Sequence, residues 1–206
     1  MDNIINEVKS IWSTYGVYLT IVKGSPINSS GIPASLNLHQ AEDLLSSVNK
    51  PANYIHVFIA KSADASLGTD GLYGINIHYG YGGEGYGFFD CANLASGDPS
   101  WRTGESSSYY LNRTGCIIFS NNIENEIPNA QGWTSTWVYA WVIAHELGHS
   151  MGIYKHSDSV PNLMHEPLFD NSYSVYKEVL QESLDFLNTR DLLGVKTVSV
   201  GNNIGQ

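Results

Sequence analysis

The sequence predicts an α/β (α+β) fold in which a twisted mixed sheet packs against helices. The first 60 residues alternate between helical and strand-like periodicity, which is the order of a layered α/β structure. A nearly all-apolar helix begins at about residue 136 and is expected to lie inside the protein rather than on its surface. With no internal repeat and no recognisable linker, the chain is expected to form a single domain, 1–206.

Four elements are expected in the N-terminal part. A helix over 2–15 carries one apolar stripe and ends at Gly16, and a second helix covers 37–48. Strands are expected over 17–22 and 54–60, where β-branched and aromatic residues are frequent. The stripe of the first helix consists of Ile4, Ile5, Val8, Ile11, Trp12 and Tyr15.

The middle of the chain has a different composition. Residues 68–89 combine eight glycines with aromatic residues, which fits either an irregular loop or an edge strand at a cleft rim. A short buried strand is expected over 116–120, and a polar connection over 121–132.

The C-terminal part is expected to hold two helices. Thr134 or Ser135 can cap a helix over 136–151, and a polar loop then leads to a last helix over 172–190.

The charge balance argues against nucleic acid as a partner. The chain has 10 Lys and Arg against 20 Asp and Glu, whereas phosphate binding needs clustered positive charge. The longest apolar run, 137–144, falls short of the ~20 residues of a membrane span. No signal peptide is visible at the start, but the abundance of Asn, Ser, Gly and Tyr favours a secreted protein whose leader is not present in this chain.

Two groups of residues leave alternatives open. Cys91 and Cys116 could form a disulfide or remain two buried thiols, because spacing alone does not decide pairing. Asp70, Glu84 and Asp90 could bind Ca²⁺, although their spacing matches no defined loop pattern.

The segment HELGH at 145–149 carries the clearest chemical signal. Residues four apart share one face of a helix, so His145 and His149 can offer two imidazole nitrogens to one metal ion. Glu146 lies one step round the helix, where its carboxylate can act as general base toward water. Two histidines at the end of a buried helix need partners, and a metal ion would satisfy both.

The segment after this helix supplies a third ligand candidate. Gly152 can end the helix and turn the chain, so that His156 returns toward the first two histidines. Met164 follows eight residues after His156. Helix, glycine turn, histidine and methionine resemble the metzincin clan of zinc endopeptidases, with the motif HExxHxxGxxH and a Met-turn, and HSDSVPNLM is most similar to the matrixin branch.

This resemblance implies an active-site helix, a Met-turn under the metal, and upper and lower parts of the domain, 1–152 and 153–206. It also implies one catalytic Zn²⁺ on His145, His149 and His156. The family's third ligand position falls on Lys155 here, so His156 requires a one-residue bulge, and Asp158 is an alternative ligand. The segment after Met164 also departs from the matrixin pattern, since His165 and Glu166 precede Pro167.

The expected function is zinc-dependent hydrolysis of protein or peptide substrates by a monomer. One alternative is a thermolysin-type zinc peptidase, in which Glu178 or Glu182 is the third ligand. Another alternative is a metzincin-like domain that binds a partner without catalysis, although Glu146 is present. The isolated histidines His39 and His56 are expected to be surface or core residues without a role in the site.

Overall fold

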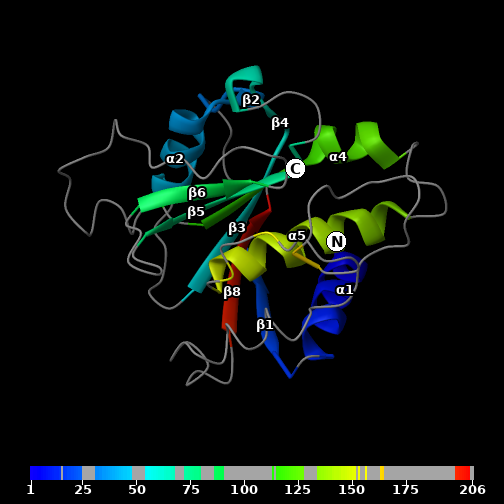
Figure 1. The fold of residues 1–206 in the computed structure, drawn as a ribbon. Coiled ribbons are helices and arrows are strands. Elements are labelled where there is room, and N and C mark those ends of the chain that lie inside the picture. Colours follow the sequence, from blue (N-terminus) through cyan, green and yellow to red (C-terminus); the bar gives the residue numbers. More distant parts are fainter. Residues whose placement is uncertain are drawn as a thin grey trace.

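A six-stranded mixed sheet with helices on both faces forms the centre of the molecule (Figure 1). This computed structural model describes residues 1–14, 16–24, 31–47, 54–67, 72–79, 86–90, 113, 115–127, 134–151, 153, 156, 163–164 and 198–204. The helices are α1 (Asp2–Ser13), α2 (Leu38–Ser46), α4 (Ser120–Glu126) and α5 (Ser135–Ser150), with a short 3₁₀ turn at Ala65–Leu67. The strands are β1 (Leu19–Lys23), β2 (Ser35–Leu36), β3 (Tyr54–Ala60), β4 (Ser62–Ala63), β5 (Gly74–Tyr79), β6 (Tyr86–Asp90), β7 (Gly115–Phe119) and β8 (Val198–Ile204).

The main sheet has the order β1-β8-β3-β7-β5-β6. The first four of these strands are mutually parallel, whereas β5 runs antiparallel to β7, and β6 antiparallel to β5. Strands β2 and β4 form a separate parallel pair. The mixed α/β class expected from the sequence is therefore confirmed.

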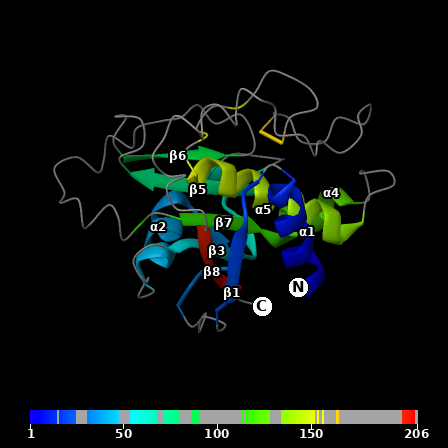
Figure 2. The same cartoon turned by 90° about the horizontal axis from the view of Figure 1, so that it is seen from below.

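Helices α1 and α5 lie on one face of the sheet and α2 lies on the other (Figure 2). Alternation along β7 divides its side chains between the two layers, because successive residues of a strand point to opposite faces. Cys116 and Ile118 belong to the apolar cluster beneath α1 and α5, while Ile117 and Phe119 belong to the cluster beneath α2. One sheet thus supports two separate cores.

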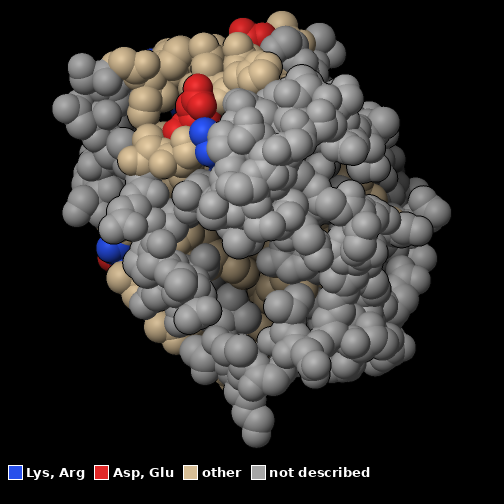
Figure 3. Space-filling model, turned by 90° about the vertical axis from the view of Figure 1, so that its left-hand side faces the viewer, with Lys and Arg blue, Asp and Glu red and all other residues tan. Residues whose placement is uncertain are grey.

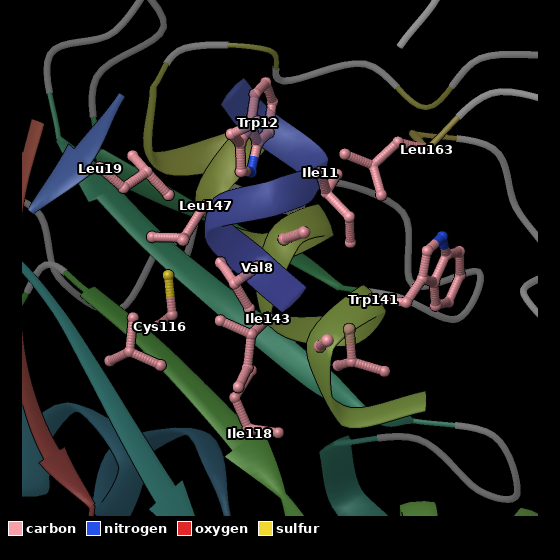
Figure 4. Packing of buried hydrophobic residues seen from close by; sticks show 14 of the residues in the cluster. Val8, Ile11, Trp12, Leu19, Cys116, Ile118, Trp141, Ile143, Leu147 and Leu163 are labelled. Atoms are coloured by element: carbon pink, nitrogen blue, oxygen red, sulfur yellow. The ribbon is translucent and has the colours of Figure 1, made fainter. Parts of the chain in front are cut away.

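Helix α1 packs directly against α5 (Figure 4). The predicted stripe of α1 is buried at Ile5, Val8, Ile11 and Trp12, and Gly16 follows the helix with a positive φ of 78°. Figure 4 shows Val8 and Trp12 beside α5, while Ile143 and Leu147 of α5 point toward the strands. Tyr15 lies outside the described residues.

The polar connection expected over 121–132 is wrong in its first part, where α4 forms. Ile123 of α4 and its C-cap residue Ile127 are four apart, and both pack on the apolar cluster beneath α1 and α5. The Asn122 side chain also donates to the Leu72 carbonyl at 2.7 Å. In the glycine-rich segment the strand part of the edge-strand alternative is confirmed, because β5 and β6 pair antiparallel at one end of the sheet; the expected cleft rim stays a prediction.

The C-terminal part contains a strand that was not expected from the sequence. Strand β8 inserts between β1 and β3 and pairs with both. The predicted helix over 172–190 lies outside the described residues.

The charges of the described residues are dispersed. On the face in Figure 3, acidic and basic side chains of these residues lie near one another, and no extended patch of either sign forms among them. Lys23 of β1 forms an ion pair with Asp2 of α1. Within the described part of the chain, no helix has both the length and the apolar character needed to cross a membrane.

Candidate metal centre

Helix α5 carries the candidate site at its C-terminal end. Its N-cap is Thr134, whose side chain accepts a hydrogen bond from the Trp137 amide, so one of the two predicted caps is confirmed. The helix is buried without interruption from Ala140 to Ser150. The apolar sequence therefore places both histidines and the glutamate of HELGH inside the protein.

Three histidines meet at this end of the helix. The Nε2 atoms of His145 and His149 are 3.1 Å apart, and each lies 3.2 Å from Nε2 of His156. Their ligand atoms all lie within 4.8 Å of one another, so the three residues are close enough to hold a metal ion. Two imidazoles come from successive turns of α5 and the third from the chain beyond the helix.

Backbone carbonyls fix the orientation of two of these rings. Nδ1 of His145 lies 2.8 Å from the Leu163 carbonyl oxygen, and Nδ1 of His149 lies 2.6 Å from that of Ile153. A carbonyl can only accept, so in both rings Nδ1 carries the proton and donates. In the neutral rings, both Nε2 atoms then present lone pairs toward the same point.

Burial keeps the central ring neutral. Burial, and next the proximity of His156, lower the pKa of His145 to about 3, although the hydrogen bond to Leu163 acts in the opposite direction. At neutral pH Nε2 of His145 therefore presents a lone pair, 3.1 Å from Nε2 of His149. A cation could share this lone pair, and the second-nitrogen bonds to carbonyls are those that metal-bound histidines commonly make.

The separations fit a tetrahedral metal. Zn–N bonds of ~2.0–2.1 Å at tetrahedral angles place ligand nitrogens ~3.3–3.4 Å apart, which is close to the observed 3.1–3.2 Å. Imidazole donors suit Zn, Cu, Fe and Ni rather than Ca or Mg. Three protein donors also leave a coordination position for water or substrate.

The chain turns directly after α5. The Ile153 amide donates to the Gly148 carbonyl at 3.0 Å, and this turn aims the Ile153 carbonyl at His149. Several residues expected at the turn or as the third ligand lie outside the described residues. They are Gly152, Lys155, Asp158, Glu178 and Glu182. His156 is the described residue that joins the two helical histidines.

Met164 packs beneath helix α5 and is completely buried. A Cβ atom added to Gly148 would collide with Sδ of Met164 and would lie 3.1 Å from its Cε and 3.5 Å from Trp12. Glycine at 148 therefore lets the thioether approach the helix backbone between the two histidines. The neighbouring residue, Leu163, supplies the carbonyl that holds His145.

Glu146 is fully buried and lies on the side of α5 that faces the sheet. A Cβ atom added to Gly74 of β5 would lie 2.9 Å from both Cγ and Oε1 of Glu146. The absence of a side chain at Gly74 therefore creates the space in which the carboxylate sits. Glu146 is not part of the three-histidine group found among the described residues.

Cys116 is a free, buried thiol, so the alternative in which it is bridged to Cys91 is not realised. Its Sγ lies 3.1 Å from Ser150 Oγ and 3.2 Å from Asn76 Nδ2, between the sheet and α5. Burial, and next the charge of Glu146, raise the pKa of this thiol to about 12. Cys91 lies outside the described residues.

The remaining candidates take no part in the histidine group. His39 is exposed and His56 is buried in β3, and neither belongs to the group. Of the calcium candidates, Asp70 and Glu84 lie outside the described residues, and Asp90 is described only as the last residue of β6.

Sequence reasoning missed the residues of the sheet that support α5. Gly74 and Asn76 were hidden in the glycine-rich segment, and Ser150 looked like an ordinary helix residue. The signal that could have found them is the alternation in GINIHY, where small and polar residues alternate with isoleucines.

Comparison of the chain with protein-family models, curated proteins and solved structures finds no match.

Proposed function

We propose that this protein is a zinc-dependent endopeptidase of the metzincin clan, similar to the matrixin branch. The observation that carries the proposal is the meeting of His145, His149 and His156 at Nε2 separations of 3.1–3.2 Å. Metal-binding proteins without catalysis commonly close a zinc site with four protein ligands, whereas three ligands and an adjacent carboxylate are typical of hydrolysis.

Two further features support the metzincin assignment. Met164 packs against the metal-binding helix at Gly148, as expected of a Met-turn. The Ile153 amide bonds to the Gly148 carbonyl just after the helix, and His156 lies beside the helical histidines despite the extra residue in the motif.

The proposed chemistry divides between the metal and Glu146. His145, His149 and His156 would hold the zinc ion, which would supply Lewis-acid polarisation of a peptide carbonyl and of water. The Glu146 carboxylate accepts the proton of the attacking water and later donates it to the leaving amine nitrogen. His145 and His149 keep their Nδ1 protons on the carbonyls of Leu163 and Ile153, which holds their Nε2 atoms in place.

The substrate is proposed to bind as an extended chain along β6. This strand lies at the end of the sheet, beyond β5, and an edge strand can add a further strand through backbone hydrogen bonds. Backbone recognition of this kind would serve peptide bonds in many sequences, which fits an endopeptidase.

Metal analysis combined with casein digestion tests the proposal. The purified protein is expected to contain one equivalent of zinc and to digest casein. A chelator should abolish digestion, and added Zn²⁺ should restore it. A protein that retains its zinc and digests neither casein nor any other unfolded protein would contradict the proposal.

A further inference from the structure

A buried polar network joins the sheet to helix α5. Asn76 of β5 and Cys116 of β7 are register partners, and both side chains reach the helix. Asn76 Nδ2 donates to the main-chain oxygen of Glu146 at 3.2 Å and to Ser150 Oγ. Cys116 Sγ lies 3.5 Å from the same Glu146 oxygen. The helical turn that carries Glu146 is therefore tied to two strands by side chains.

Strand β5 contacts Glu146 at two levels. Gly74 and Asn76 are two residues apart and so lie on the same face of the strand. Asn76 holds the backbone of Glu146, while Gly74 leaves the space for its carboxylate, since a Cβ at Gly74 would lie 2.9 Å from Oε1. The backbone position and the side-chain position of Glu146 are thus set by one rigid strand.

Core stability alone does not explain an asparagine at this position. Asn76 is 1% exposed, and its Oδ1 has no hydrogen-bond partner among the described residues. Burying an acceptor without a partner costs free energy that an apolar side chain would avoid. Its neighbours Ile75 and Ile77 show that this strand is otherwise apolar on its opposite face. The hydrogen bonds that Nδ2 donates to helix α5 therefore explain why asparagine stands at this position.

We propose that Asn76 is a positioning residue for the general base Glu146, acting together with the space at Gly74. This role rests on the proposed peptidase function. Through its bond to the Glu146 carbonyl, Asn76 fixes the turn of α5 in which the carboxylate faces β5 and the histidines face the chain that follows the helix. A small displacement of a base from its working position lowers rate strongly without changing substrate affinity.

A kinetic double-mutant cycle tests this role. Asn76→Ala is expected to lower kcat about 10- to 100-fold, the range typical of residues that orient groups at a metal site, with unchanged KM and zinc content. In a Glu146→Gln background the same substitution should have no further effect, because its effect passes through Glu146. Asn76→Ser keeps a hydrogen-bond donor, so its kcat should fall less than that of Asn76→Ala. If the alanine variant does not fold, the serine variant can take its place in the cycle.

Asn122→Ala is the matched control. It removes an amide donor that bonds a main-chain carbonyl, Leu72, at 2.7 Å, but it lies on α4. Its kcat should equal that of the wild type. An equal loss in Asn122→Ala, or a full further loss when Asn76→Ala is added to Glu146→Gln, would overturn the positioning role.

The visible absorption spectrum of the Co²⁺-loaded protein gives a readout that does not depend on hydrolysis. Glu146→Gln should alter the spectrum, Asn76→Ala should alter it in the same direction, and the double variant should match Glu146→Gln. If the wild type cleaves no peptide but the spectra behave in this way, the peptidase proposal fails and the positioning role stands. If the wild type cleaves peptides while Asn76→Ala matches it in kcat and spectrum, the positioning role is wrong.

Discussion

The two sides of helix α5 are held in different ways. On the histidine side, the two helical imidazoles contact the chain that follows the helix at the Ile153 carbonyl, His156 and the Leu163 carbonyl. On the sheet side, the partners are Gly74, Asn76 and Cys116, which belong to hydrogen-bonded strands. Glu146, the proposed general base, is thus held by the sheet, whereas the proposed ligand set also needs His156 from beyond the helix.

We expect metal binding and folding to be coupled on the histidine side of α5 and not on the sheet side. Ordering a connecting segment costs conformational entropy, and a bound metal ion can offset that cost. The sheet side needs no such contribution, because its strands pair through the backbone. Metal removal should therefore loosen the region around His156 and leave the surroundings of Glu146 ordered.

Glu146→Gln should give the largest effect and should separate the two sides of the helix. Loss of a general base lowers the rate by ~10²–10⁴. Zinc binding should not change, because Glu146 is not one of the three clustered histidines. The variant is expected to bind zinc like the wild type, to unfold at the same temperature and to lose nearly all casein digestion. Normal zinc content with near wild-type turnover would rule out the role of Glu146.

His156→Ala should affect the other side. Removal of one of three ligands is expected to weaken zinc binding by more than the ~10–100-fold typical of residues that only orient ligands. Competition with a chromophoric chelator measures this change. Glu178→Ala and Glu182→Ala are the controls and should bind zinc normally. Weak zinc binding in either control with normal binding in His156→Ala would favour the thermolysin-type alternative.

Gly74→Ala should lower activity while the histidine side stays intact. Its Cβ would lie 2.9 Å from Oε1 of Glu146, so the carboxylate must move, while the fully buried helix backbone stays. A displacement of ~1 Å can cost ~10²-fold in rate. We expect a loss of kcat of about 10- to 100-fold with unchanged zinc affinity, measured on one fluorogenic peptide and one chelator titration. A wild-type kcat would show that the carboxylate position is not set by β5.

Gly148→Ala should give the smallest effect, seen as stability. Alanine gains ~1 kcal/mol over glycine inside a helix, but overpacking a filled site costs ~1–3 kcal/mol. The added Cβ would collide with Met164 Sδ, so the net change in unfolding free energy should be destabilising. In a Met164→Ala background the space is open, and Gly148→Ala should become stabilising. Urea unfolding of the four proteins measures the change in unfolding free energy in each background. A stabilising effect of Gly148→Ala in both backgrounds would contradict the packing of Met164 against Gly148.

Much of the fold followed from periodicity. The stripe of α1, the cap and burial of α5, and strands β3 and β7 came from apolar spacing and capping residues, which act within a few residues of the chain. Strand β8 could not be found in this way, because it pairs with strands distant in sequence, β1 and β3. Helix α4 was missed because its apolar contacts are few, at Ile123 and Ile127, and its polar contacts are with residues distant in sequence, such as Leu72.

The candidate site also combines residues that local spacing predicts with residues that only the fold brings together. His145, Glu146 and His149 were visible because the spacing within one helix fixes which residues share a face. His156 was placed by the turn expected at Gly152 and by the resemblance to a known motif, because no helical spacing fixes its position. Gly74 and Asn76 were not predicted, because their role depends on which strand lies beneath Glu146.

X-ray absorption spectroscopy of the zinc-loaded protein can count the imidazole ligands of the proposed site. We expect one equivalent of tightly bound zinc with three imidazole nitrogens at ~2.0–2.1 Å, reduced to two in His156→Ala. This follows from the three Nε2 atoms that meet at 3.1–3.2 Å. Absence of tightly bound zinc, or a wild-type spectrum with only two imidazoles, would contradict the three-histidine site.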